Sequence, residues 1–224
     1  MTRQLEQELN ELKQKLLSMG GYAEASVTKA IKALIDRDDD LAREVKESDT
    51  IIDRHEIEVD EMAIHLLSKA PLASDLRFIT VAMKISQNLE RVADEACTIA
   101  RRSIELSQEP QLKPYVDIPR MATIALQMLK SALDAFVNRT PDEARAIIPK
   151  DKEVDLINKQ LHRELSSFMI ERPTTISRCL NLMVISKSIE RIADHATNIA
   201  EEVVYLYEAR DIRHTGKAAV AAPK

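Results

Sequence analysis

The sequence contains no tryptophan, only three glycines and two cysteines, and aromatic residues make up 3% of its 224 residues. Sandwiches and barrels rely on aromatic and β-branched residues with frequent glycine turns, and α/β folds need many tight connections, so both classes are disfavoured. No uncharged run approaches the roughly 20 apolar residues of a membrane span. Cys97 and Cys179 are too few for a disulfide framework and are expected to be reduced thiols inside helices.

What the sequence has instead is 45% hydrophobic and 31% charged residues, drawn mainly from good helix formers. This mixture predicts an all-α protein and excludes intrinsic disorder. A net charge of −5 without a basic stripe argues against nucleic-acid binding. The first residues lack the apolar core of a signal peptide, which predicts a cytoplasmic protein.

Proline, glycine and aspartate divide the chain into periodic segments whose apolar residues recur at spacings of three, four and seven. The helices are expected at about 4–35, 38–45, 49–69, 74–107, 120–137, 140–148, 150–171 and 174–210. Asp38 is the expected N-cap of the second segment, and Thr140 with Glu143 forms a capping-box signature. The Gly20-Gly21 pair is expected to bend or loosen the first helix without ending it. The proline-rich stretch 110–119 is the best linker candidate.

The second half of the chain repeats the first. At an offset of 102, Asp49 aligns with Asp151 and Pro71 with Pro173; beyond the prolines the offset becomes 100. There Met83–Ala100 and Met183–Ala200 share ten of 18 residues. The repeat predicts two tandem, pseudo-symmetric three-helix bundles, at 1–109 and 118–214, followed by a flexible tail at 215–224.

Four pairs of acids spaced by four fall at matching positions of the two repeats. They are Asp49/Asp53, Glu90/Asp94, Asp151/Asp155 and Glu190/Asp194. On a helix this spacing places both carboxylates on one face, and two such pairs on neighbouring helices would form an oxygen-rich pocket for a cation such as Mg, Mn or Fe. The alternative is that these acids cap helices and form salt bridges with Arg91 and Arg191. Four further pairs, which include Asp36/Asp40 and Glu56/Asp60, do not repeat and indicate only a solvated helix face.

The residues that follow the acid pairs differ between the repeats. Asn198 and Glu201 continue down the helix from Glu190 and Asp194 and would add oxygen donors, whereas the first repeat has Thr98 and Arg101 at those positions. The second site is therefore predicted to be the stronger one. His195 lies one residue off this face, where exposure is a better expectation than ligation; the other histidines, His55, His65 and His162, do not cluster and are expected to be structural.

The sequence resembles the PhoU family of phosphate-transport-associated regulators over nearly its whole length. The resemblance rests on Met19-Gly20-Gly21, Ala73-Ser74-Asp75-Leu76-Arg77, the duplicated Glu-Arg-(Val/Ile)-Ala-Asp segments, the acid pairs and Asp211-Ile212-Arg213-His214. It implies two three-helix bundles with multinuclear metal clusters, often iron, on the acid pairs; Mn, Mg and Zn remain candidates. Thr98 and Arg101 depart from the fuller motif and weaken the case for the first cluster.

The resemblance further implies a cytoplasmic homodimer that represses the phosphate-starvation (Pho) regulon. In the family this protein couples the ATPase subunit of the phosphate ABC importer to a sensor histidine kinase, so contact with the membrane is indirect. The expected function is therefore that of a non-enzymatic adaptor and negative regulator. Two alternatives stay open: a metal-dependent hydrolase or oxidase that uses the acid pocket to activate water, and a metal-free structural bundle.

Overall fold

The structure, a computed structural model, describes residues 3–69 and 72–213. The predicted tail at 215–224, together with His214, lies outside the described residues. The helices are α1 (Arg3–Asp36), α2 (Asp39–Leu67), α3 (Ala73–Ser107), α4 (Asp117–Asn138), α5 (Pro141–Ile147), α6 (Asp151–Glu171) and α7 (Ile176–Glu208). Short 3-10 turns cover Ile148–Lys150 and Pro173–Thr175. Within the described residues there is no strand, which confirms the all-α class.

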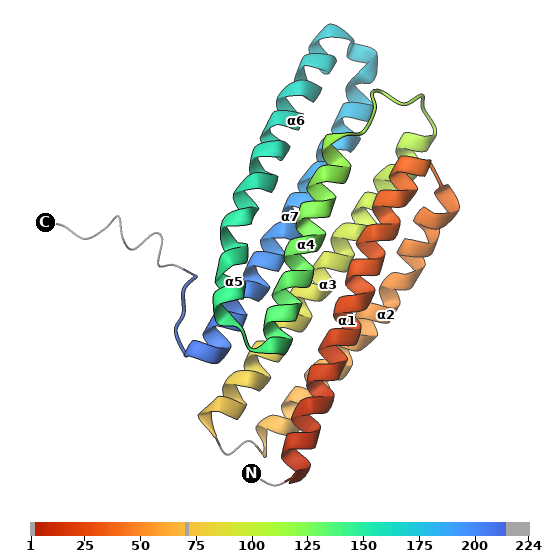
Figure 1. The fold of residues 1–224 in the computed structure, drawn as a ribbon. Coiled ribbons are helices and arrows are strands. Elements are labelled where there is room, and N and C mark those ends of the chain that lie inside the picture. Colours follow the sequence, from red (N-terminus) through yellow and green to blue (C-terminus); the bar gives the residue numbers. More distant parts are fainter. Residues whose placement is uncertain (1–2, 70–71, 214–224) are drawn as a thin grey trace, which may run out of the picture.

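The helices form two three-helix bundles that lie side by side (Figure 1). Helices α1, α2 and α3 pack together in the first bundle, and α4, α6 and α7 in the second, with α5 packed on α7. The two bundles meet mainly where α3 runs antiparallel to α7. This is the predicted pair of bundles, and it follows from amphipathic helices that must each bury an apolar stripe.

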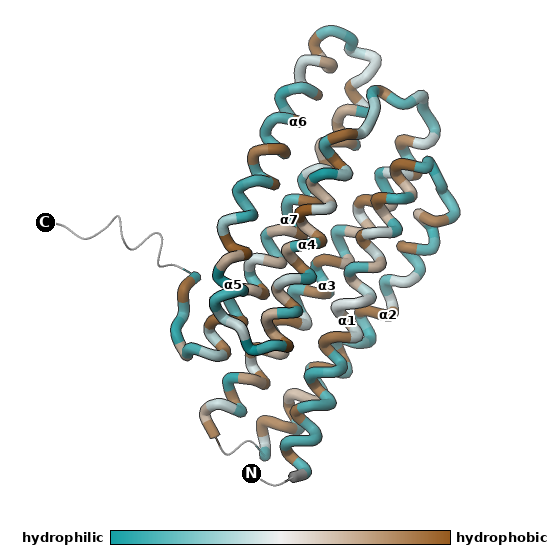
Figure 2. The backbone as a smooth tube through the Cα atoms, in the orientation of Figure 1, coloured by the Kyte–Doolittle hydropathy of each residue, from teal (hydrophilic) through white to brown (hydrophobic). Residues whose placement is uncertain are grey.

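The apolar stripes of both bundles join into one continuous core. Hydrophobic residues alternate with hydrophilic ones along every helix (Figure 2), as the periodicity requires. Helices α3 and α7 are covered on several sides and carry the most buried residues. Both cysteines, Cys97 and Cys179, are free thiols buried in this core, as predicted.

The second helix differs from its prediction. The sequence predicts a short helix to Val45 and a new one from Asp49, but α2 runs unbroken from Asp39 to Leu67. No proline or glycine lies between the two predicted segments, and Val45 and Ile52 continue one buried stripe across the junction. The expected start is correct, because the Asp38 side chain caps α2 by accepting a hydrogen bond from the Leu41 N–H at 2.9 Å.

The capping box predicted at α5 forms only in part. Thr140 is the N-cap residue and Pro141 opens the helix, but the Thr140 hydroxyl donates to the Glu143 carboxylate at 2.8 Å and makes no hydrogen bond to a backbone N–H. The two side chains therefore satisfy each other. The helix nevertheless packs against the protein through Ala144 and Ile147, which are buried.

The Gly20-Gly21 pair lies inside α1 without interrupting it, and the two glycines have different surroundings. A Cβ atom at Gly20 would lie 2.5 Å from Cδ1 of Leu133 on α4, whereas one at Gly21 would meet nothing within 4 Å. Gly20 therefore lies where the two bundles approach each other closely. Gly21 costs the helix conformational entropy, and no close contact requires a glycine there.

Alanine substitutions separate these two roles. We expect Gly21→Ala to raise the free energy of unfolding by about 0.5–1 kcal/mol, because alanine favours the helix and nothing obstructs its methyl group. Gly20→Ala gains the same helix propensity but must displace the Leu133 side chain, so its stability should lie below that of Gly21→Ala. Urea unfolding followed by circular dichroism checks both; equal stabilisation by the two changes would contradict the close approach.

Candidate functional site

The first set of repeated acids faces the groove between α2 and α3. Asp49 and Asp53 lie on α2, and Glu90 and Asp94 lie on α3. Burial, reinforced by Asp94, raises the pKa of Glu90 to about 7, and its Oε2 atom has no hydrogen-bond partner. Burial also raises the pKa of Asp49, to which Asp53 and Asp94 contribute against a hydrogen bond with the Cys97 thiol. The four carboxylates are therefore close enough to repel one another.

The second set repeats this arrangement between α6 and α7. Burial raises the pKa of Asp151 to about 6, and the largest contributions from other charges come from Asp194 and Asp155, followed by Glu190. Burial and Glu190 likewise raise the pKa of Asp194. One oxygen of Asp151, Oδ1, is buried without a hydrogen-bond partner. The structure thus brings together the members of each predicted foursome.

Two further residues belong to these acid sets, and the sequence reasoning missed both. Glu56 on α2 has a pKa raised by burial and then by Asp60, Asp53 and Asp94, so it faces the first set. Asn158 on α6 donates from Nδ2 to Glu190 at 2.8 Å, and its own Oδ1 is buried without a partner. The offset of 102 makes Glu56 and Asn158 equivalent, which is the signal that could have found them.

The arginines beside the acids break the pseudo-symmetry. Arg91 folds back onto its own repeat, with Nη1 3.0 Å from the Asp94 carboxylate. Its equivalent, Arg191, reaches across to the other bundle and lies 3.0 Å from Glu95. The position equivalent to Glu95 holds His195, which offers Arg91 no acid to pair with. The first acid set therefore carries a cation of its own, while in the second set Glu190 pairs with Lys187 at 2.6 Å.

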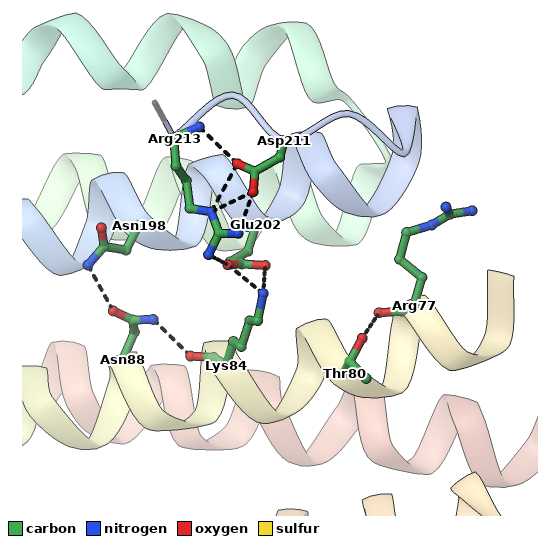
Figure 3. A network of polar contacts seen from close by, with 8 residues as sticks. All are labelled: Arg77, Thr80, Lys84, Asn88, Asn198, Glu202, Asp211 and Arg213. Carbon is green, nitrogen blue, oxygen red and sulfur yellow. Dashed lines mark hydrogen bonds and ion pairs between the residues drawn. The ribbon is translucent and has the colours of Figure 1, made fainter. Parts of the chain in front are cut away.

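Asn198 and Glu201, the predicted extension of the second site, point elsewhere. Asn198 hydrogen-bonds to Asn88 on α3 at 3.3 Å (Figure 3), so it faces the contact between the bundles. Glu201 lines a surface pocket with the basic residues Arg145, Lys152 and Arg213. Asp194 shares an open pocket with Asn198, Thr98 and Arg101, which places the differing residues of both repeats around one cavity.

His195 is half-buried rather than exposed, because its Nδ1 lies 2.9 Å from the Asn88 side-chain oxygen. The remaining histidines lie apart from one another. His55 stacks on Tyr22, His162 hydrogen-bonds to Ser186 at 3.1 Å, and His65 is exposed near the end of α2.

A buried ion-pair network fastens the segment directly after α7 to both bundles. Glu202 on α7 is only 5% exposed and binds Lys84 on α3 at 3.0 Å (Figure 3). Arg213 also reaches Glu202, at 3.4 Å, and pairs with Asp211. Part of the Asp211–His214 motif thus positions the segment after α7. The predicted ligand set includes Glu201 but not Glu202, the buried residue next to it.

The donors suit a hard or borderline cation, since they are carboxylate and amide oxygens. Among them, Glu90 and Asp151 have raised pKa values, and one buried oxygen each of Asp151 and Asn158 has no hydrogen-bond partner. As the side chains stand, however, no three His, Cys, Asp or Glu residues of 3–69 and 72–213 are placed to hold a metal ion together. Ligation would therefore require the carboxylates to rotate toward a common point, where the charge of the bound cation would offset their mutual repulsion.

None of the helices in the described ranges is long and apolar enough to cross a membrane.

The fold and the acid sets define a class of protein: a duplicated three-helix bundle with an acid pair on each of two neighbouring helices in both repeats. The chain belongs to the PhoU family. The family profile described as "PhoU domain" matches residues 16–103 and 118–203, one match in each half.

Known relatives match along most of their length. A protein of Pseudomonas aeruginosa, "Phosphate-specific transport system accessory protein PhoU homolog", is 41% identical over 96% of this chain and 90% of the relative. The Escherichia coli protein "Phosphate-specific transport system accessory protein PhoU" is 35% identical over 95% of this chain and 89% of its own.

Solved structures agree with the fold. The crystal structure of PhoU from Pseudomonas aeruginosa superposes with a TM-score of 0.89 at 41% identity, over 92% of this chain and 99% of that one. The structure of the phosphate transport system regulatory protein PhoU from Streptococcus pneumoniae gives 0.88 at 29% identity, over 93% and 99%.

Proposed function

We propose that this protein regulates phosphate uptake and negatively regulates the phosphate-starvation regulon. The observation that carries the proposal is the match to PhoU proteins over nearly the full length of the chain, in sequence and in fold. Those relatives are named as accessory proteins of the phosphate-specific transport system. Both repeats and the connection between them are present here, so the whole architecture of such an accessory protein is available.

The partners we propose are the ATPase subunit of the phosphate ABC importer and a phosphate-sensing histidine kinase. The protein acts between them as a non-enzymatic, cytoplasmic adaptor and as a homodimer, and it reaches the membrane only through these partners. Long amphipathic helices with charged outer faces suit docking against partner helices. Exposed apolar residues on α6, Leu156 at 66% and Ile170 at 83%, support a further contact surface.

The acid sets are the proposed metal sites of this regulator. Asp49, Asp53, Glu90 and Asp94 would hold the first ion or cluster, with Glu56 beside them; Asp151, Asp155, Glu190 and Asp194 would hold the second, with Asn158. A bound cation, multinuclear iron or another metal such as Mn, Mg or Zn, supplies the positive charge that these carboxylates lack. The residues then hold α2 against α3 and α6 against α7, which stabilises the surface that partners recognise. Asn198 and Glu201 would join only after their side chains move.

A deletion strain of the organism that encodes the protein tests the regulatory proposal. Without the gene, a reporter of phosphate-starvation genes should be expressed even in high phosphate, and a plasmid copy should restore repression. If the deletion strain still represses the reporter in high phosphate, the proposal is wrong.

A further inference from the structure

We propose that the pocket at the outer end of the first bundle binds an acidic segment of a partner protein. The pocket has a volume of about 700 Å³ and is formed by the first turns of α1 and α3, the residue that ends α4 and the last turn of α7. Its lining includes three basic residues, Lys13, Arg77 and Arg139, and it is remote in sequence from the acid pairs. It is thus a site that the metal proposal does not use.

Two of these basic residues have no anionic partner within 3–69 and 72–213. The Nε atom of Arg77 is buried without a hydrogen bond, and Figure 3 shows its guanidinium group pointing away from the ion-pair network. The Arg139 side chain makes no hydrogen bond or ion pair with any described residue. Lys13, by contrast, donates to the Val137 carbonyl at 3.0 Å. The pocket therefore offers two guanidinium groups that remain free to bind acceptors.

The internal repeat shows what an arginine at the position of Arg139 can bind. Arg139 is equivalent to Arg37, and both have a left-handed backbone conformation, with φ of 60° and 56°. At the opposite end of the molecule, Arg37 donates to the carbonyls of Leu106, Ser107 and Glu109 as the chain leaves α3. Arg178 completes that site by binding the Pro110 carbonyl at 3.0 Å and the Glu109 carboxylate at 3.2 Å. There, two arginines bind carbonyls at the C-terminal end of α3 and in the turn that follows, together with an acid of that turn.

The buried carboxylate of Asp75 favours a peptide over a simple anion as the occupant of the pocket. Asp75, in the first turn of α3, lines the pocket, is 5% exposed, and its Oδ2 has no hydrogen-bond partner. Its equivalent Thr175 is also buried, but the Thr175 hydroxyl donates to the Phe168 and Arg172 carbonyls. A buried acceptor without a donor is costly. The main-chain N–H of a bound segment would satisfy Asp75, whereas inorganic phosphate would be repelled by it.

The charge of the pocket and its apolar surface further restrict which kind of segment can bind there. Lys13, Arg77 and Arg139 outnumber the acids of the lining, Glu6 and Asp75, and the N-terminus of α3 adds positive potential. Leu9 and Phe78 provide an apolar wall beside these charges. The C-terminal segment 214–224 contains two lysines and a histidine but no aspartate or glutamate, so its charge does not suit this pocket. A partner segment that combines an acidic with an apolar residue does.

Selection from a random 12-residue peptide library displayed on phage, against the intact purified protein, tests the proposal. We expect the selected peptides to be enriched in aspartate and glutamate. In fluorescence anisotropy their affinity should fall at least about tenfold in the double variant Arg77→Gln/Arg139→Gln, because charge-assisted hydrogen bonds are lost. Arg163→Gln, which neutralises an exposed arginine on α6, is the matched control and should leave the affinity unchanged. Glutamine avoids truncating either side chain, and thermal melts verify that each variant is folded.

Several results would overturn the proposal. Selected peptides without acidic enrichment, or affinities that the double variant leaves unchanged, would show that the arginines do not bind them. Displacement of the peptides by inorganic phosphate, without any effect of chloride at equal ionic strength, would show a phosphate site instead. Tighter binding after deletion of residues 214–224 would assign the pocket to the chain's own tail.

Discussion

Replacing both Asp151 and Asp194 with alanine is expected to remove at least half of the metal that the purified protein carries. The two carboxylates come from α6 and α7, and Asp194 is the charge that raises the pKa of Asp151 most. Their loss removes one donor from each helix and leaves Asp155 and Glu190 as the two remaining carboxylates of the second set, which halves its charge. The second set should account for half of the metal, because both sets have a cationic neighbour, Arg91 at the first and Lys187 at the second. Elemental analysis by inductively coupled plasma mass spectrometry measures the change.

The matched control for this change is Asp36→Ala/Asp40→Ala, which removes an acid pair of the same spacing that the second repeat lacks. Both of its residues are exposed. The control should retain the metal content of the unaltered protein. Equal metal content in all three proteins would exclude the second acid set as a metal site.

Glu90→Gln is expected to stabilise the metal-free protein at pH 8 by about 1–2 kcal/mol. Burial and the neighbouring Asp94 raise the pKa of Glu90 to about 7, so the folded state binds its proton more tightly than the unfolded chain does. The stability that this proton confers is fully present below pH 4.5, the ordinary pKa of glutamate, and is lost as the pH rises through about 7. Glutamine keeps the neutral form at every pH; the lost ion pair with the exposed Arg91 side chain offsets part of the gain.

Urea unfolding of chelator-treated protein at pH 5 and pH 8 measures this effect. The variant should gain less, relative to the unaltered protein, at pH 5 than at pH 8, because pH 5 lies near the lower end of the range over which the proton is lost. Taking the difference cancels the opposite pH dependence of His55 and His195, whose pKa values burial lowers. Glu61→Gln, an exposed glutamate on α2, should show no such gain. A variant that is less stable than the unaltered protein at both pH values would contradict the claim that the ionised Glu90 carboxylate destabilises the fold.

Most of the fold follows from apolar periodicity, because each helix must bury one stripe and proline or a capping residue marks its ends. The one break expected inside α2 failed because Ser48 and Asp49 are weak signals that a continuous stripe from Val45 to Ile52 overrides. At this junction, tertiary packing decides the structure and local polarity does not. The duplication, which depends on the order of identical residues, was the strongest guide to the pair of bundles.

The acid sets show where a one-dimensional pattern reaches its limit. The predicted foursomes do face each other, because spacing by four keeps two residues on one face. Asn198 is eight residues beyond Glu190, and a rotation of about 100° per residue turns it some 80° away, toward α3. Glu201 returns to the face but lies roughly 17 Å further along the axis. Glu56 and Asn158 went unnoticed because their partners lie on another helix, and only the packing of α2 on α3 and of α6 on α7 reveals them.

The most direct test of the account places Asp151→Ala/Asp194→Ala as the only copy of the gene in its own organism. A reporter of phosphate-starvation genes is then measured in high phosphate, alongside Asp36→Ala/Asp40→Ala and the deletion strain, with protein levels verified by immunoblot. The account predicts that the reporter is derepressed in the Asp151/Asp194 variant and the deletion strain, and repressed in the control. Full repression by the Asp151/Asp194 variant at normal protein level would contradict a regulatory role for the repeated acids.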